Sequence, residues 1–334
     1  GSARGLLLQP PLPQTHCHIA KAEAKKRIER MKPRLRAWLA ASGFTGASGQ
    51  VQLAPDENGA LERVFVGAGD GEARWVLGDL PSRLPAGRYR LDAGYSKRQA
   101  TAAALGWALG SYAFARYKKR EKKAIALDLP EKADAGYVTR TAEAIFLVRD
   151  LVNTPAADLG PGELAGAAQA LARKHGAKCR VILGDDLLQR NFPMIHAVGK
   201  ASTRAPRLID LNWGTRGPRL ALVGKGVCFD SGGLDLKTAA GMQMMKKDMG
   251  GAAVALGLAE AIMAAKLPVR LRLLVPAVEN AVAGNAYRPL DVIPGRNGKT
   301  IEIGNTDAEG RVVLSDALVE GSKEKPALML DFAT

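Results

Sequence analysis

The chain is poor in the residues that most often hold structural metals or cross-links. Its three cysteines, Cys17, Cys179 and Cys228, are widely spaced and form no CxxC pair. We therefore expect neither a disulfide framework nor a cysteine-rich zinc site. Only four histidines are present, two of them in His16-Cys17-His18. Adjacent side chains alternate in direction and do not converge easily on one ion, so we interpret this triplet as incidental.

Long hydrophobic runs are also missing. The longest nearly apolar stretch, 252–265, is interrupted by Glu260 and is shorter than the roughly 18 residues of a membrane span. The first residues, Gly-Ser-Ala-Arg-Gly, lack the charged-then-apolar pattern of a secretory signal. We expect a cytoplasmic protein without a membrane partner.

Acidic residues are outnumbered by basic ones, 33 to 48, which gives a net charge of +15. Much of the excess lies in two segments, 25–36 and 118–123. A basic surface of this kind attracts phosphates, so DNA binding stays open, but no aromatic-interleaved patch or DNA-reading motif accompanies it. We favour a solvated helix face or a helix docked on an acidic partner subunit.

The first part of the chain alternates between strand and helix patterns. An amphipathic helix is predicted over 18–42, broken or kinked at Pro33, and a long Ala- and Leu-rich helix over 100–117. Short strands are predicted at 51–53, 64–66, 75–77 and 124–127. This alternation indicates an α/β domain over residues 1–135.

A helical linker is predicted over 136–160, with a helix over 138–151 that ends before Asn153-Thr154-Pro155. Residues 161–334 again show strand and helix patterns in turn. Within their strands, apolar and polar residues do not strictly alternate, as expected when helices cover both faces of a sheet. The sequence predicts a larger α/β domain with a mainly parallel central sheet. Its strands and helices are predicted at 162–175 (helix), 178–183, 207–212, 220–223, 250–265 (helix), 270–276, 300–303, 315–321 (helix) and 327–332.

Three segments at strand ends carry the candidate chemistry. The first is Val-Gly-Lys-Gly-Val-Cys-Phe-Asp-Ser-Gly-Gly-Leu-Asp-Leu-Lys at 223–237. The second is Met-Met-Lys-Lys-Asp-Met-Gly-Gly at 244–251, in which Asp248 could simply cap the following helix. The third is Asn-Thr-Asp-Ala-Glu-Gly-Arg at 305–311. Acid clusters of this kind suit hard divalent cations. From the residues alone, a dinuclear hydrolase, a phosphate or nucleotide site and no site at all remain open, although no Walker loop is present.

The three segments, in this order, resemble the site motifs of the leucyl aminopeptidase family, the M17 peptidases. The 305–311 segment reproduces the core of the family signature residue for residue, and Asn153-Thr154-Pro155 resembles its linker motif. The resemblance is strong over 140–334 and loose over 40–130. It implies a macro-like α/β N-terminal domain and a metal-dependent aminopeptidase that removes leucine and other apolar N-terminal residues through a water bridging two metals.

The resemblance also implies roles for single residues. One Mn²⁺ or Zn²⁺ ion would be held by Lys225, Asp230, Asp248 and Glu309. A second would be held by Asp230, Asp307 and Glu309.

Four other residues receive roles in catalysis or substrate binding. Lys237 would polarise the scissile carbonyl, and Arg311 would hold a bicarbonate that acts as general base. Met245 and Thr334 would line the pocket for the first side chain of the peptide. Asp235 stands where the family commonly has serine, so its negative charge could tune Lys237.

The family usually continues for about a third more catalytic domain beyond the position of Thr334. The resemblance implies a homo-hexamer for the complete protein. Because part of the catalytic domain lies beyond Thr334 in the family, the activity of this chain stays open. A binding protein, a two-metal phosphatase and an inactive subunit are the alternatives. The presence of all seven expected metal-binding and catalytic residues weighs against an inactive subunit.

Overall fold

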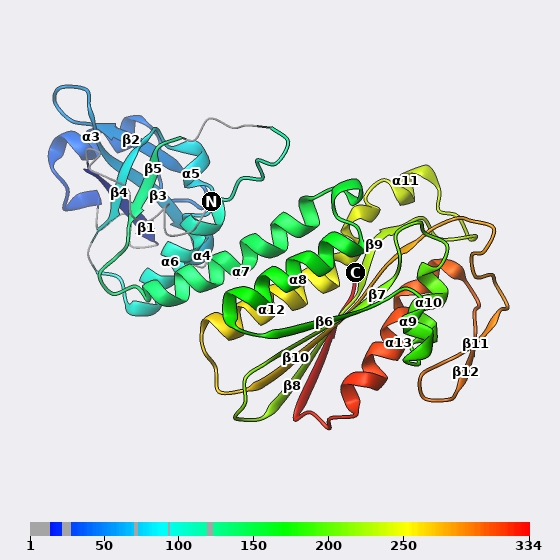
Figure 1. Cartoon of the computed structure of the whole chain (residues 1–334). Coiled ribbons are helices and arrows are strands. Elements are labelled where there is room, and N and C mark those ends of the chain that lie inside the picture. The colour runs from blue at the N-terminus through cyan, green and yellow to red at the C-terminus, as the bar shows by residue number, and fades with distance from the viewer. Residues whose placement is uncertain (1–13, 22–27, 70–72, 93, 119–122) are drawn as a thin grey trace. The chain divides into compact units, whose positions relative to one another are not determined.

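The computed structural model describes residues 14–21, 28–69, 73–92, 94–118 and 123–334 (Figure 1). The chain divides into two compact units, 1–146 and 147–334. The division falls inside helix α7 (Ala135–Asn153). The finer division into 1–135, 136–160 and 161–334 stays a prediction.

The first unit is built on a five-stranded sheet in the order β2-β3-β1-β4-β5. These strands are β1 (Gln14–Lys21), β2 (Val51–Pro55), β3 (Leu61–Gly69), β4 (Gly87–Leu91) and β5 (Ile125–Asp128). All neighbours are parallel except β2 and β3. The helices are α3 (Pro33–Ala41), α4 (Ala73–Val76), α5 (Leu80–Arg83) and α6 (Lys97–Gly110). The predicted α/β character is confirmed.

Three details of this unit correct the sequence prediction. The predicted helix over 18–42 is wrong at its start, because residues 14–21 form a central strand, and Pro33 begins α3 rather than kinking a longer helix. The predicted strand at 75–77 overlaps helix α4, which packs on α6. The helix predicted to reach residue 117 ends at Gly110, whose backbone lies against the Gly78 carbonyl.

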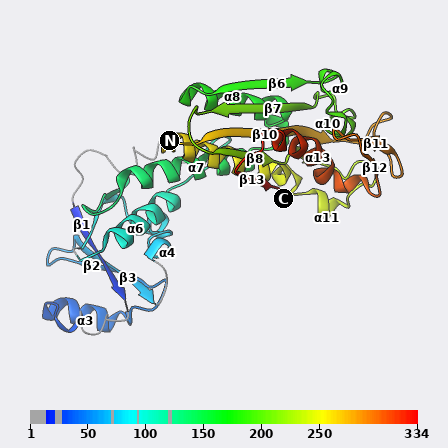
Figure 2. The same ribbon diagram turned by 90° about the horizontal axis from the view of Figure 1, so that it is seen from below.

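The second unit has three layers, with helices on both faces of a six-stranded sheet (Figure 2). The main strand order is β13-β8-β10-β7-β6, and β9 also pairs with β10. The strands are β6 (Lys178–Leu183), β7 (Arg207–Trp213), β8 (Arg219–Gly224), β9 (Gly226–Asp230), β10 (Arg270–Asn280) and β13 (Leu328–Phe332). Only β7 runs against the others among these strands. The predicted mainly parallel sheet is confirmed.

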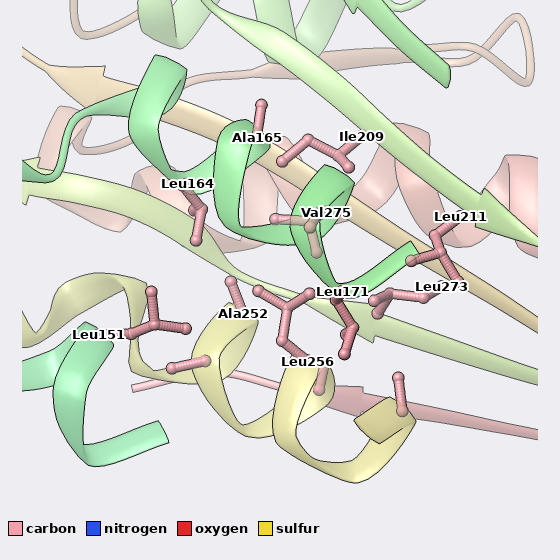
Figure 3. Close-up of a cluster of buried hydrophobic side chains, with 14 of the residues drawn as sticks. Leu151, Leu164, Ala165, Leu171, Ile209, Leu211, Ala252, Leu256, Leu273 and Val275 are labelled. Carbon is pink, nitrogen blue, oxygen red and sulfur yellow. The ribbon is translucent and has the colours of Figure 1, made fainter. Parts of the chain in front are cut away.

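Strand β10 shows why the strands of this sheet have continuous apolar sequences. Leu273 and Val275 pack into one core with α8 (Pro161–His175) and α12 (Gly250–Ala264) (Figure 3). Leu274 and Val278 pack on the opposite face with α10 (Pro193–Gly199) and α13 (Glu309–Ser322). Each fully buried Leu or Val contributes roughly 1.5–3 kcal/mol of hydrophobic free energy, which stabilises the packing of the helices on the sheet.

The remaining elements of the second unit are short. They are α9 (Asp186–Gln189), α11 (Ala239–Met242), the 3-10 helices η1 (Ala156–Asp158), η2 (Met245–Met249) and η3 (Thr306–Ala308), and strands β11 (Val292–Pro294) and β12 (Thr300–Glu302). The strand predicted at 300–303 is present as β12, but it pairs only with β11 in a separate hairpin sheet. No helix among the described residues is long and apolar enough to cross a membrane.

His16, Cys17 and His18 lie in β1, where the structure describes the backbone but not the side chains. Of the two basic segments, 25–27 and 119–122 lie outside the described residues. Cys179 and Cys228 are free thiols.

Candidate metal centre

The candidate residues gather at one edge of the second sheet. Strands β8, β10 and β13 run in parallel, and Lys225, Asn280 and Thr334 lie at or just beyond their carboxyl ends. The 3-10 helices η2 and η3 bring Asp248 and Asp307 to the same edge. This is where α/β sheets commonly place their binding sites.

Lys225 lies among carboxylates in the buried part of the site. Its Nζ is 2.8 Å from Oδ2 of Asp248 and 2.8 Å from Oε1 of Glu309. It also donates a hydrogen bond to the Thr334 carbonyl, at 3.1 Å. Asp248 does not cap α12, because the residue at the cap position is Met249 and no side chain bonds there. The capping interpretation of Asp248 is therefore wrong.

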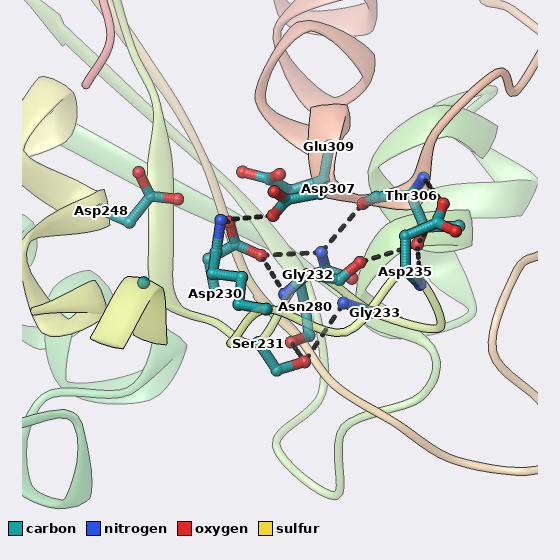
Figure 4. A network of polar contacts seen from close by, with 12 residues as sticks. Asp230, Ser231, Gly232, Gly233, Asp235, Asp248, Asn280, Thr306, Asp307 and Glu309 are labelled. Carbon is teal, nitrogen blue, oxygen red and sulfur yellow. Dashed lines mark hydrogen bonds and ion pairs between the residues drawn. The ribbon is translucent and has the colours of Figure 1, made fainter. Parts of the chain in front are cut away.

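Lys237 contacts a second pair of carboxylates. Its Nζ lies 3.0 Å from Oδ2 of Asp230 and forms an ion pair with Oδ1 of Asp307. Asp230 is itself held by the Gly232 amide and by Asn280 Nδ2, which donate to its Oδ1 at 2.9 and 2.8 Å (Figure 4). The ammonium group therefore connects the 230–237 loop with the turn that carries Asp307.

The site carries more negative than positive charge. Four carboxylates, those of Asp230, Asp248, Asp307 and Glu309, surround the two ammonium groups of Lys225 and Lys237. Burial and the neighbouring carboxylates of Asp230 and Asp248 raise the pKa of Glu309 to about 7, despite the opposing effect of Lys225.

The same excess of negative charge acts on the lysines. Burial lowers the pKa of Lys225, but Glu309 and Asp248 outweigh this effect and raise it above its ordinary value. The pKa of Lys237 is likewise raised, because its hydrogen bonds to Asp307 and Asp230 outweigh burial. With these carboxylates as partners, both lysines are cationic.

The geometry and the donor atoms fit divalent cations. Oxygen atoms of Asp230, Asp307 and Glu309 lie within 4.8 Å of one another, so the three side chains could hold one ion. Oδ2 of Asp248 and Oε1 of Glu309 are buried, and each lies 2.8 Å from the same partner, Nζ of Lys225. Buried carboxylate oxygens need such partners, and a hard cation could take this role in place of the ammonium group.

Three predicted residues lie around this cluster rather than in it. Arg311 is exposed in the first turn of α13 and has no ion pair within the described part of the chain. Met245 is half-buried in η2. Thr334 donates through Oγ1 to Oδ1 of Asp248, at 3.1 Å.

Sequence reasoning missed three residues that support the cluster. Asn280 and Tyr287 both donate to the carbonyl of Thr306, at 3.0 and 2.6 Å. All three are buried. Thr306 belonged to a recognised motif, but nothing in the sequence marked Asn280 or Tyr287, because neither lies in one.

Comparisons with known proteins identify the family. The catalytic-domain model of the cytosol aminopeptidase family matches residues 146–334, and the M17 aminopeptidase N-terminal domain model matches 16–130. A probable cytosol aminopeptidase of Corynebacterium diphtheriae is 37% identical over 319 residues, which cover 89% of this chain and 63% of that protein. One from Geobacter sp. (strain M21) is 42% identical over 71% of this chain and 51% of that protein. The chain thus spans about half to two thirds of the length of these relatives.

Solved structures agree with this assignment. The crystal structure of a cytosol aminopeptidase from Coxiella burnetii has a TM-score of 0.92 and 48% identity, covering 97% of this chain and 72% of that one. The bottromycin maturation enzyme BotP in complex with Mn has a TM-score of 0.82 and 34% identity, covering 94% of this chain and 70% of that one. The chain belongs to the M17 cytosol aminopeptidase family.

Proposed function

We propose that this chain is the metal-binding part of an aminopeptidase that removes leucine and other apolar residues from the N-termini of peptides. The observation that carries the proposal is the cluster of four carboxylates and two lysines at the carboxyl edge of the sheet, in a member of the M17 family. BotP binds Mn, which supports a divalent metal here.

The residues of the cluster would form two metal sites that share Asp230 and Glu309. Lys225, Asp230, Asp248 and Glu309 would hold one Mn²⁺ or Zn²⁺ ion, and Asp230, Asp307 and Glu309 would hold the second. Bound metals would lower the pKa of a coordinated water toward about 7 and so supply a nucleophile at neutral pH. Lys225 can act as a ligand only after it loses its proton, whereas the carboxylates bind in their ionised form.

Lys237 works as a fixed positive charge. Its raised pKa keeps the ammonium protonated, and its position beside Asp230 and Asp307 directs it into the site. A charge held there stabilises the oxyanion that forms from the scissile carbonyl, an effect of roughly 3–4 kcal/mol for one donor in other hydrolases. Arg311, exposed at the start of α13, would hold a bicarbonate that removes the proton of the attacking water.

Recognition of the substrate follows from the same site. The free amine of a peptide can ligate a metal, which favours cleavage at the first residue rather than within the chain. Met245 and Thr334 would line the pocket for that residue. We further propose a cytoplasmic protein and, for the complete protein, a homo-hexamer. DNA binding by the basic surface is a separate hypothesis, tested by whether a gel shift weakens steeply with salt.

Hydrolysis of a panel of aminoacyl p-nitroanilides, with Mn²⁺ and Zn²⁺ added in turn, tests the proposed function. We expect release of p-nitroaniline from the leucine substrate only with added metal. Glu309→Gln should lose metal and activity together, because a shared carboxylate is removed. Normal turnover with two metals still bound to Glu309→Gln would contradict the assignment.

A further inference from the structure

Asp235 connects two loops that are far apart in the sequence. Its Oδ2 accepts a hydrogen bond from the backbone amide of Thr306, at 2.7 Å. In return, the backbone amide of Asp235 donates to Oγ1 of Thr306, at 2.9 Å. The carboxylate therefore faces Thr306, and its recorded bonds are to this residue rather than to Lys237 (Figure 4).

Thr306 is fully buried, and each of its polar atoms is bonded to another segment. Its amide donates to Asp235, its hydroxyl donates to the Gly232 carbonyl at 2.7 Å, and its carbonyl accepts from Asn280 and Tyr287. Thr306 directly precedes Asp307 and lies three residues before Glu309. Any movement of Thr306 thus moves two of the metal-site carboxylates.

Asp235 itself belongs to a closed loop, residues 231–237, that ends at Lys237. The Lys237 amide donates to the Ser231 carbonyl at 3.0 Å, which joins the two ends of the loop. Gly232 and Gly233 both have positive φ, +89° and +67°. A Cβ on Gly233 would lie 3.0 Å from Oγ1 of Thr306 and 2.9 Å from Oδ1 of Asn280, so the loop wraps closely around Thr306.

We propose that Asp235 is a positioning residue that holds the Lys237 loop and the Asp307–Glu309 turn in one fixed arrangement through Thr306. This inference rests on the proposed function for its meaning in catalysis. The arrangement sets where the Lys237 ammonium lies relative to Asp307 and keeps the carboxylates ready for metal. Side chains that orient metal ligands in this indirect way typically change affinity or activity by about 10–100-fold when removed.

The test compares Asp235→Ala with Asp235→Asn in the 334-residue chain. Asparagine keeps a carbonyl oxygen that can accept from the Thr306 amide, whereas alanine does not. Three quantities are measured: hydrogen exchange of the Thr306 amide without metal, Mn²⁺ affinity by calorimetry, and kcat and KM on leucine p-nitroanilide. We expect faster exchange, Mn²⁺ affinity reduced at one site by about 10–100-fold, and lower kcat at similar KM for Asp235→Ala.

Two variants separate positioning from other effects. Asp235→Asn should stay close to wild type, and an equal loss in both variants would mean that negative charge rather than the hydrogen bond matters, which overturns the proposal. Asp291→Ala is the matched control, because Asp291 also accepts a backbone hydrogen bond in a turn, from Arg288 at 2.9 Å, but its carboxylate contacts none of the metal-site residues among the described part of the chain. It should bind Mn²⁺ like wild type.

The outcomes distinguish this proposal from the proposed function. If Asp235→Ala weakens Mn²⁺ binding but the wild type hydrolyses no anilide, the positioning role stands and the proposed function fails. If the wild type is active and Asp235→Ala matches it in exchange, affinity and kcat, the positioning role fails. A wild type without Mn²⁺ sites overturns both.

If Asp235→Ala does not fold, substitutions of Thr306 test the proposal instead. Circular dichroism first checks that Asp235→Ala is folded. If it is not, Thr306→Ser, which keeps the hydroxyl, is compared with Thr306→Val, which loses it. Thr306→Ser should retain Mn²⁺ affinity and Thr306→Val should lose it by a similar factor. Equal affinities in these two variants would overturn the proposal.

Discussion

Nζ of Lys225 lies 2.8 Å from Oε1 of Glu309, and both side chains are almost completely buried, at 8% and 1% exposure. This ammonium compensates for carboxylates that would otherwise lie unpaired in a medium of low dielectric constant. A metal ion bound at Glu309 would compete with the proton of Lys225 and with any proton on Glu309. Metal binding and proton release are therefore coupled.

The first prediction follows from this coupling. The pKa of Glu309 is raised to about 7 and that of Lys225 is raised as well, so Mn²⁺ must displace protons from both groups. The affinity for Mn²⁺ should therefore be higher at high pH and should decrease as the pH is lowered below about 7. The decrease is up to about tenfold per pH unit for each proton that metal binding releases. Calorimetry in buffers with different ionisation enthalpies counts these protons. An affinity that is constant across neutral pH would contradict the coupling.

The second prediction uses the close contact between Gly310 and Lys225. A Cβ on Gly310 would lie 2.7 Å from Cε and 2.9 Å from Nζ of Lys225. Since these atoms are the far end of a flexible side chain, Gly310→Ala should leave the fold intact but displace Lys225. We expect an unchanged melting temperature and Mn²⁺ affinity weaker by about tenfold or more.

Gly304→Ala provides the control for this variant. A Cβ on Gly304 meets nothing within 4 Å, and the residue precedes the same motif. It should bind Mn²⁺ like wild type. If both alanine variants bind equally well, Lys225 can be displaced without consequence, and its role as a ligand is wrong.

The third prediction concerns Glu320 on α13, which fixes the far end of that helix. Its carboxylate accepts hydrogen bonds from Arg272 at 2.9 Å and from Arg296 at 3.0 Å. These partners outweigh the opposing effect of burial and lower the pKa of Glu320 to about 2. Because the folded pKa is below that of the unfolded chain, the stabilisation is complete above about pH 4.5 and is lost as the pH falls toward 2.

Glu320→Gln should therefore cost about 2 kcal/mol of unfolding free energy at neutral pH, with a smaller difference from wild type in acid. Urea unfolding at several pH values measures both. Glu324→Gln is the matched control, since Glu324 also bonds to Arg272 but its side chain is 44% exposed. Its loss should be smaller, within about 1 kcal/mol. A pH-independent difference for Glu320→Gln would contradict the lowered pKa.

The sequence predicted the second unit better than the first for a physical reason. Strand β10 is buried on both faces, so its apolar run is unmistakable, and it was predicted from Arg270 onward. Strand β4 is buried only at alternate positions, Tyr89 and Leu91, among arginines. That period of two was present in the sequence but short, and β4 was missed. The apolar run at 75–77 is too short for its periodicity to distinguish a strand from a helix.

The site shows the same limit. The acidic and basic residues of the three segments could be named as candidates because they lie at predicted strand ends, but their roles in a metal site followed only from the resemblance to the M17 family. Asn280 could not be named, because it is the last residue of strand β10, next to Glu279, and belongs to none of the three segments. Its importance depends on a tertiary contact, the bond from its Nδ2 to Asp230, which no local pattern encodes.

The final prediction distinguishes the two lysines of the site. Lys225 must lose its proton to ligate a metal, and arginine cannot be deprotonated in a protein. Lys225→Arg should therefore lose one of two bound metals, and the larger guanidinium would also press against the backbone of Gly310, which lies close to Lys225. Lys237 is needed for its charge, so Lys237→Arg should keep both metals and lose turnover through altered geometry.

Mass spectrometry measures the metal content, and an activity assay measures kcat, for Lys225→Arg and for Lys237→Arg. Lys323→Arg is the control, since Lys323 pairs with Glu320 at 3.1 Å but is 56% exposed, and it should match wild type in both measurements. A Lys225→Arg variant with two metals beside a Lys237→Arg variant with fewer would mean that the roles are reversed. Loss of metal in both would mean that the ammonium of Lys237 supports the ligand carboxylates of Asp230 and Asp307 rather than the substrate, because those are the side chains it contacts.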